Sequence, residues 1–181
     1  MRIEPLILPG TFKILLQPQV DERGYFMRTF DKIAFGACGL CSSWIQENQS
    51  HSRPNVLRGL HFQNPPHSEA KLIRAVSGEI LDVFVDLRRS STTYGRWQSI
   101  KLSAAEDVAV YIPKGFAHGF CTMDSEATVD YKIDAPYVPE AAAGLLWSDP
   151  DLAIAWPVKD PVVSARDRSW PRFASFRSPF D

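Results

Sequence analysis

An arginine and a histidine, Arg58 and His61, stand three residues apart in the largely apolar segment 55–63. Imidazole titrates near neutral pH and can accept a proton, whereas a guanidinium suits oxyanions. In an extended strand these side chains would point to opposite faces, because successive side chains alternate. Gly59 lies between them and tolerates backbone angles that other residues avoid, so it can supply a bend that lets them converge. The alternative is a core histidine beside a surface arginine.

The hexapeptide at 58–63, RGLHFQ, resembles the signature of the dTDP-4-dehydrorhamnose 3,5-epimerase family. These are cupin-type enzymes that act on nucleotide-linked 4-keto-6-deoxy sugars. Further blocks that resemble the family lie at 21–26, 46–50, 71–74, 78–83, 86–88, 112–120, 131–132, 147–150 and 164–167. Their order and their coverage of nearly the whole chain argue against chance similarity.

Proton transfer next to a ketone needs a base of near-neutral pKa, an electrophile for the enolate oxygen and an acid on the opposite face. The resemblance implies His61 as the base, oriented by Asp167, and Tyr131 as the proton donor. It places Lys71 at the C4 carbonyl of the sugar. Without the resemblance, each of these residues has a commoner role, since a lysine at a strand start is usually a solvated charge and a tyrosine usually packs.

Substrate recognition by such an enzyme requires groups that hold a diphosphate, for which planar guanidinium groups are suited. By resemblance His118 lies in the pocket near His61 and the substrate oxygen. Other candidates for binding the nucleotide are polar or aromatic: Arg23, Phe26, Arg28, Gln46, Asn48, Arg58 and Tyr137. The resemblance also implies that Arg23 reaches the pocket of a neighbouring subunit by strand exchange.

The chain departs from the family pattern at two positions on the nucleotide side. After Met27 the family usually has glutamate, whereas this chain has Arg28, which reverses the charge. Where the family has two tyrosines, the chain has Pro136 and Tyr137, which leaves one ring to stack on a base. The sequence therefore indicates epimerase chemistry more firmly than dTDP as the carrier, and a guanine or cytosine nucleotide stays open.

Length and composition restrict the number of domains, the possible partners and the cellular compartment. We expect one domain, 1–181, because this length supports a single full core. The formal charge of −1, without a dense basic run, argues against nucleic acid as a partner. We expect no membrane association and a cytoplasmic protein, because no signal peptide or long apolar run is present, and three cysteines fit a reducing compartment.

The spacing of the histidines indicates whether the chain has a cupin-type metal site. Many cupins bind a metal through a His-x-His pair, but neither His61 nor His118 has another histidine two residues away. We therefore predict no metal. The chain also lacks a glycine-rich nucleotide fingerprint such as Gly-x-Gly-x-x-Gly, and we predict no cofactor.

We expect short strands to position these side chains, because fourteen prolines divide the chain into short elements. Runs 73–76 and 80–87 flank a Ser-Gly-Glu turn and predict a hairpin, and alternation within 80–87 predicts one core-facing side. Runs 97–102, 108–112 and 127–133 continue the pattern. Helical signals are confined to 31–35 and the tail near 164. The pattern predicts an all-β, cupin-type jelly roll with short peripheral helices, the fold that the resemblance also implies.

The main hypothesis is a cofactor-independent epimerase that inverts C3, C5 or both, converting dTDP-4-dehydro-6-deoxyglucose to dTDP-4-dehydrorhamnose. One alternative is a single-site epimerase, acting at C3 or C5 only, on a GDP- or CDP-linked keto sugar. Another is a sugar-nucleotide-binding cupin without catalysis. We also expect a homodimer, because by resemblance Arg23 and Arg28 lie on an N-terminal strand that crosses to the partner.

Overall fold

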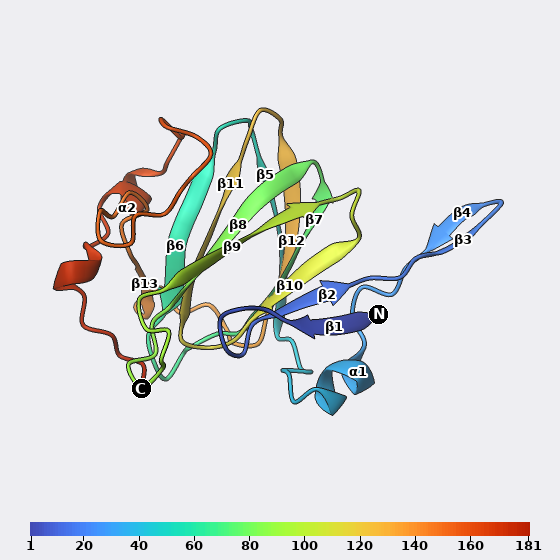
Figure 1. Cartoon of the computed structure of the whole chain (residues 1–181), viewed down its shortest axis with the longest axis horizontal. Helices are drawn as coiled ribbons and strands as arrows, with labels where there is room; N and C mark the ends of the chain where they lie inside the picture. Colours follow the sequence, from blue (N-terminus) through green and yellow to red (C-terminus); the bar gives the residue numbers. More distant parts are fainter.

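Two antiparallel sheets form the body of the molecule, which the computed structural model describes over residues 1–181 (Figure 1). One sheet has six strands, in the order β1 (Arg2–Pro5), β2 (Phe12–Leu15), β10 (Val108–Ile112), β7 (Lys71–Ser77), β12 (Ala127–Ile133) and β5 (Gln46–Ser52). The other has five, in the order β13 (Ala142–Gly144), β6 (Leu57–Gln63), β11 (Phe116–Thr122), β8 (Glu79–Asp86) and β9 (Trp97–Ser103). The all-β prediction is confirmed.

The main core lies between the two sheets. Its largest cluster combines Ile73 and Val110 of the six-stranded sheet with Phe84 and Phe120 of the five-stranded one. Such a double layer buries the inward side chains of both sheets, as expected for a jelly roll. Part of the interior remains open and forms the cavity described below.

The turn at Ser77-Gly78-Glu79 is not a hairpin, so that prediction is wrong. β7 pairs with β10 and β12, whereas β8 pairs with β11 and β9 in the other sheet. Gly78 has a φ of 69°, and a Cβ there would lie 2.2 Å from the carbonyl oxygen of Glu126. The turn is therefore a tight corner at which the chain passes from one sheet to the other.

Strand β8 is buried on both faces, although its alternation predicted only one. Ile80 and Phe84 point into the core between the sheets. Val83 and Val85 belong to a second cluster, in which the C-terminal part of the chain covers the outer face of the five-stranded sheet. The polar residues in the alternation, Asp82 and Asp86, are therefore not on a solvent-exposed face, because both are fully buried on the inner side of the strand.

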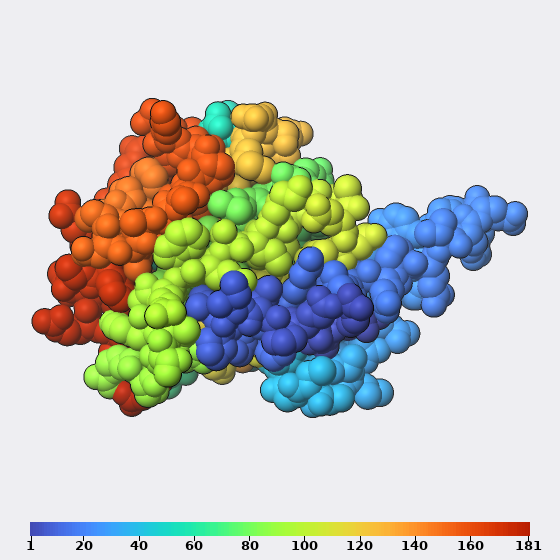
Figure 2. Space-filling model, viewed as in Figure 1, coloured from blue at the N-terminus to red at the C-terminus, as the bar shows by residue number.

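A hairpin of β3 (Gln19–Asp21) and β4 (Gly24–Phe26) extends away from the body, as Figures 1 and 2 show. Its side chains are exposed, including Tyr25 at 68% and Phe26 at 66%. We call residues 19–26 the arm.

Helices are short and peripheral, as predicted. α1 (Lys32–Ala37) is capped by the Asp31 side chain, and α2 (Ala165–Arg168) by that of Ser164. A 3-10 turn follows at Phe173–Ser175. No helix of the chain has the length and apolar character that crossing a bilayer requires.

Candidate active site

A cavity of about 780 Å³ opens between the sheets. It is lined by residues from β5, β6, β7, β11 and β12, together with the segment around α2. Most of the side chains singled out from the sequence line it: Gln46, Asn48, Arg58, His61, Lys71, His118, Tyr131, Tyr137 and Asp167. We call this cavity the pocket.

Arg58 and His61 both line the pocket because β6 is irregular at Gly59. His118 of β11 pairs with His61, but Phe120 pairs with Arg58, so β6 carries an extra residue between these pairs. Gly59 has a φ of 150°, and a Cβ there would lie 2.6 Å from the Cα of Gly119. The bend predicted at Gly59 is confirmed, and it depends on two glycines at the point where β6 and β11 approach closely.

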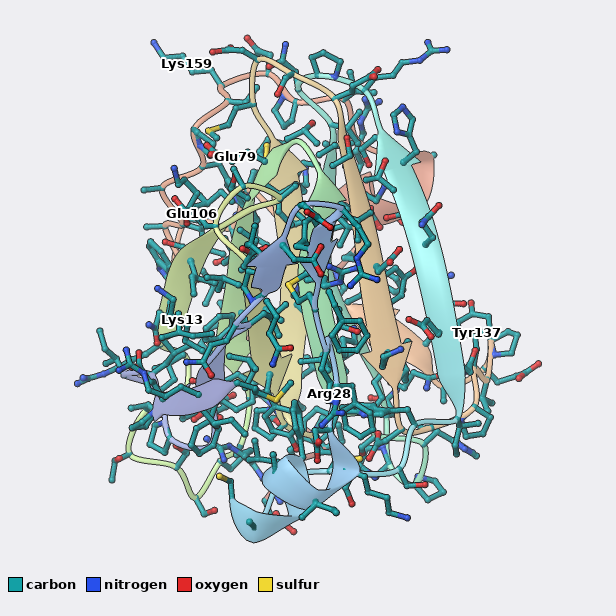
Figure 3. The ribbon with its side chains drawn as sticks, turned by 90° about the vertical axis from the view of Figure 1, so that its right-hand side faces the viewer. Lys13, Arg28, Glu79, Glu106, Tyr137 and Lys159 are labelled. Atoms are coloured by element: carbon teal, nitrogen blue, oxygen red, sulfur yellow. The ribbon has the colours of Figure 1, made fainter.

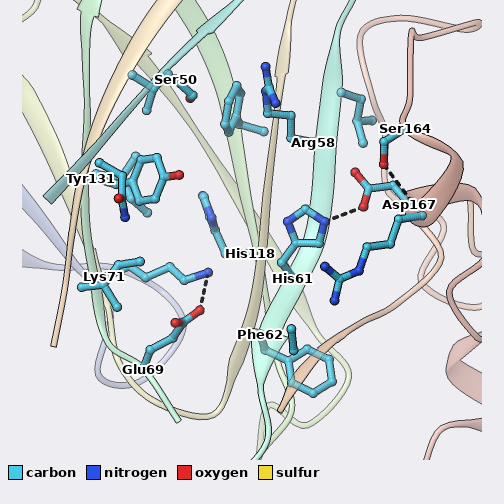
Figure 4. Close-up of a pocket in the computed structure, with 18 of the residues that line it drawn as sticks. Ser50, Arg58, His61, Phe62, Glu69, Lys71, His118, Tyr131, Ser164 and Asp167 are labelled. Atoms are coloured by element: carbon cyan, nitrogen blue, oxygen red, sulfur yellow. Dashed lines mark hydrogen bonds and ion pairs between the residues drawn. The ribbon is translucent and has the colours of Figure 1, made fainter. Parts of the chain in front are cut away.

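His61 and Asp167 form a hydrogen-bonded pair, with Nε2 2.6 Å from Oδ1 (Figure 4). Burial alone would raise the pKa of Asp167, but hydrogen bonds from His61 and the Gly59 backbone N–H help to hold it below its usual value. Asp167 is therefore the acceptor. His61 accordingly donates from Nε2, and Nδ1 is the ring nitrogen that Asp167 does not engage.

Two further acid–base pairs lie on the same cavity. Lys71 Nζ is 3.1 Å from Glu69 Oε1, and both side chains are almost buried. His118 Nε2 lies 2.7 Å from Oδ2 of the fully buried Asp82, whose pKa is raised by burial. In Figure 4 Lys71 and His118 point into the space between Tyr131 and His61.

Tyr131 enters the pocket from β12, on the side opposite His61 (Figure 4). Its neighbours Val129 and Ile133 line the pocket too, so the predicted shared face is correct. Burial raises the pKa of Tyr131, which Arg58 partly offsets, so the phenol keeps its proton at neutral pH. The pocket therefore presents a protonated phenol and an imidazole ring on opposing walls.

Two of the other predicted binding residues in the pocket, Arg58 and Gln46, are held by hydrogen bonds. Arg58 donates from Nε to Ser52 Oγ and from Nη2 to the carbonyl oxygen of His51, each over 3.0 Å. Gln46 donates to the carbonyl oxygen of Ala135 over 2.7 Å. These contacts orient one guanidinium and one amide along the rim of the pocket, where they can meet anionic or polar groups.

Arg23, Phe26 and Arg28 do not line the pocket of their own chain. Arg23 lies in the turn of the arm and pairs with Asp21. Arg28 lies beyond β4 and pairs with Asp31, the N-cap of α1, over 2.9 Å. In Figure 3 Arg28 lies beside α1, well apart from Tyr137. The expectation that both arginines lie on a strand is therefore wrong.

Comparison with known proteins places the chain in a family. Residues 5–175 match the family model described as dTDP-4-dehydrorhamnose 3,5-epimerase. The enzyme of that name from Methanothermobacter thermautotrophicus is 46% identical over 162 residues, which cover 87% of each chain. The chain belongs to the dTDP-4-dehydrorhamnose 3,5-epimerase family. As a member of it, the chain is an isomerase with a cupin jelly roll.

Solved structures agree with this assignment. The dTDP-6-deoxy-D-glucose-3,5-epimerase of Legionella pneumophila, in complex with dTDP-4-keto-L-rhamnose, superimposes with a TM-score of 0.92 at 34% identity, covering 97% of this chain and 94% of that one. A 3'-monoepimerase from Streptomyces bikiniensis, in complex with dTDP-quinovose, gives 0.88 at 34% identity, covering 94% and 87%. This fold therefore serves both double and single epimerases.

Sequence reasoning missed three residues of this site. Glu69 lies two residues before Lys71 and was not predicted as its partner, whereas Asp82, which holds His118, comes from the neighbouring strand β8, so that no local spacing connects those two. Trp170 follows α2 in the tail and lines the pocket beside Asp167. A fourth residue, Arg166, donates to the Tyr137 hydroxyl over 3.4 Å and was visible only as part of a family-like block.

Proposed function

We propose that this epimerase inverts C3 and C5 of a nucleotide-linked 4-keto-6-deoxyhexose, with dTDP-4-dehydro-6-deoxyglucose as the substrate and dTDP-4-dehydrorhamnose as the product. The observation that supports it best is the placement of His61 and Tyr131 on opposing walls of one cavity (Figure 4). Inversion requires removal of a proton from one face of a carbon and delivery to the other. A single two-sided pocket supplies both groups.

In the proposed first half of the reaction, Nδ1 of His61 takes the proton from the carbon next to the ketone. The electrons of the broken C–H bond move into the C–C bond, and negative charge develops on the C4 oxygen. The Lys71 ammonium and the His118 ring, which both line the pocket, are the groups proposed to stabilise that oxygen. Asp167 stabilises the imidazolium that forms on His61.

In the second half, the Tyr131 hydroxyl donates its proton to the opposite face of the same carbon, and the ketone re-forms. The raised pKa of Tyr131 keeps this proton available at neutral pH. His61 then releases its proton to solvent and Tyr131 regains one. Repetition at the second carbon completes the double inversion, and each step is redox-neutral.

The nucleotide end of the substrate is proposed to lie along Arg58, Gln46 and Asn48, with Tyr137 stacked on the base. Tyr137 lines the pocket and is 54% exposed, which leaves ring surface available for a base. The two similar structures both contain a dTDP-linked sugar. Arg28, which reverses the family's usual charge, is the reason to test CDP and GDP as well.

A single-site epimerase is the second candidate. It is favoured by the likeness to a 3'-monoepimerase, whose fold matches this chain nearly as well as that of the double epimerase. The same base and acid would serve either reaction. What separates them is whether the sugar ring can present both carbons in turn.

Deuterium exchange tests both candidates together. The protein is incubated in deuterated water with dTDP-, CDP- and GDP-linked 4-keto-6-deoxyhexoses, and the label is located by NMR. We expect deuterium at C3 and C5 with inverted configuration, fastest with dTDP. Label at one carbon only would replace the main proposal by the single-site one, and no label with any carrier would refute both.

A further inference from the structure

The indole of Trp170 lies directly against the His61–Asp167 pair. Its Nε1 donates to Asp167 Oδ1 over 3.3 Å, and this is the same oxygen that His61 Nε2 contacts at 2.6 Å. Trp170 is half-buried and lines the pocket. One carboxylate oxygen therefore accepts hydrogen bonds from two N–H groups, one on the proposed base and one on a residue of the tail.

The indole is held in this position from both sides. Gly144 of β13 is the register partner of His61, and a Cβ at Gly144 would lie 2.6 Å from Trp170 Nε1. The absence of a side chain at Gly144 is thus what lets the indole edge reach the carboxylate. On the other side the Arg166 guanidinium carbon lies 5.0 Å from the centre of a Trp170 ring, a cation–π distance.

We propose that Trp170 is a positioning residue that divides the charge of Asp167 Oδ1 between two hydrogen bonds and so sets the pH range in which His61 accepts a proton. The proposal rests on the proposed function, in which His61 is the base. An oxygen that accepts two hydrogen bonds is a weaker acceptor toward each. With the indole in place, Asp167 orients His61 but stabilises its protonated form less than a carboxylate without that second donor would.

The pKa of Asp167 is consistent with this division. Burial would raise it, and the donors around the carboxylate, Trp170 among them, hold it down. Loss of the indole N–H should therefore raise the pKa of Asp167 and strengthen its bond to His61.

The other charged and titratable groups facing this pair come from several elements. They are Arg58 on β6, Lys71 with Glu69, His118 with Asp82, Tyr131 and Arg166. Trp170→Phe leaves all of these residues in place and keeps an aromatic ring for the Arg166 guanidinium to contact, so the group that it removes from the pair is the N–H.

Trp170→Phe is the direct test, with three measurements. The Asp167 carboxyl carbon is titrated by NMR, the low-field proton of the His61–Asp167 hydrogen bond is recorded, and deuterium exchange into substrate is followed against pH. We expect a higher Asp167 pKa and a proton resonance at lower field. The acid limb of the exchange profile should move about half a pH unit upward, so that the rate below the limb falls about threefold.

Trp156→Phe is the matched control. It removes the same N–H from a hydrogen bond to the carbonyl oxygen of Trp147, over 2.8 Å, at a residue that does not line the pocket. It should change none of the three measurements. Trp170→Leu also lacks the donor and should move them in the same direction as Trp170→Phe, which excludes an effect of ring shape.

The outcomes separate this proposal from the function on which it rests. An unchanged Asp167 titration and an unchanged low-field proton in Trp170→Phe would overturn the role of Trp170. If both NMR signals shift while the exchange profile does not, Trp170 acts on the pair as proposed, but His61 is not the base. Equal shifts in Trp156→Phe would reduce the effect to general destabilisation and overturn the proposal.

Discussion

The titratable residues of the pocket differ in what surrounds them, and their proposed roles follow from that. His61 has a carboxylate partner that fixes its proton on Nε2. Tyr131 has no such partner, and burial keeps its phenol protonated. The proposed base is thus held by a carboxylate and the proposed acid by none, which matches the different roles assigned to them.

Tyr131→Phe should separate proton removal from inversion. His61 still abstracts the proton, but the opposite face has lost its donor, so inversion should fall by about 10²–10⁴-fold. Deuterium should then enter with retained configuration. NMR of the recovered sugar nucleotide measures label and configuration together, and inversion at the wild-type rate would show that another group is the acid.

Substitution of Arg28 should change which nucleotide carrier the protein prefers. In this chain it pairs with Asp31 near α1, and in an assembled dimer it would act on the partner's nucleotide. Arg28→Glu should shift preference toward dTDP, because a carboxylate accepts from base or ribose donors that a guanidinium repels. Competition binding of dTDP, CDP and GDP to both proteins measures this. Lys32→Glu gives the same charge change nearby at an exposed position, and equal shifts in both variants would contradict a specific role.

At the scale of elements, the site depends on the close approach of β6 and β11. A Cβ at Gly119 would lie 2.7 Å from the carbonyl oxygen of Arg58 and 2.9 Å from the Cα of Gly59. Both neighbours are backbone atoms that cannot rotate away. The strands that carry Arg58, His61 and His118 can therefore keep their spacing only with glycine at this point.

Gly119→Ala should destabilise the protein by about 1–3 kcal/mol, the usual cost of overpacking, and should reduce exchange because the two histidine strands separate. Urea unfolding measures the first effect. Gly36→Ala is the control, since a Cβ there meets nothing within 4 Å and lies in α1. It should be neutral or slightly stabilising. A loss in Gly36→Ala as large as in Gly119→Ala would remove the argument from close approach.

The limits of sequence reasoning also lie at this scale. The bend at Gly59 was predictable, because an odd spacing between two pocket residues demands an irregular strand. The corner at Gly78 was not, because a hairpin and a passage between sheets use the same turn residues and differ only in distant pairing. Asp82 and Trp170 were missed for a related reason: what brings them to the site is the packing of separate elements, which no local pattern records.

At the scale of the whole molecule, the apolar side chains of the arm are not covered by the rest of the chain. Val20, Tyr25 and Phe26 are each at least 66% exposed on a two-stranded hairpin that extends from the body (Figure 2). A hairpin of this size is marginally stable alone. Burial against a second copy would stabilise it and would bring Arg23 and Phe26 toward the partner's pocket, as the family resemblance implies.

We therefore predict a homodimer by analytical ultracentrifugation. Replacing Val20 and Tyr25 together by serine should weaken the dimer and raise KM, although neither residue lines the pocket of its own chain. Ile33→Ser is the control, because Ile33 is 84% exposed on α1 and not on the arm. A monomeric wild type with full activity would contradict the prediction.

The most direct test of the account is deuterium exchange at C3 and C5 of the keto sugar, compared between wild type, Asp167→Asn and His61→Ala. Asp167→Asn should keep weak exchange, because the base remains while the charge that supports it is gone. His61→Ala should lose exchange at both carbons, since it removes the proposed base. Exchange near the wild-type rate in His61→Ala would contradict the mechanism proposed for this epimerase.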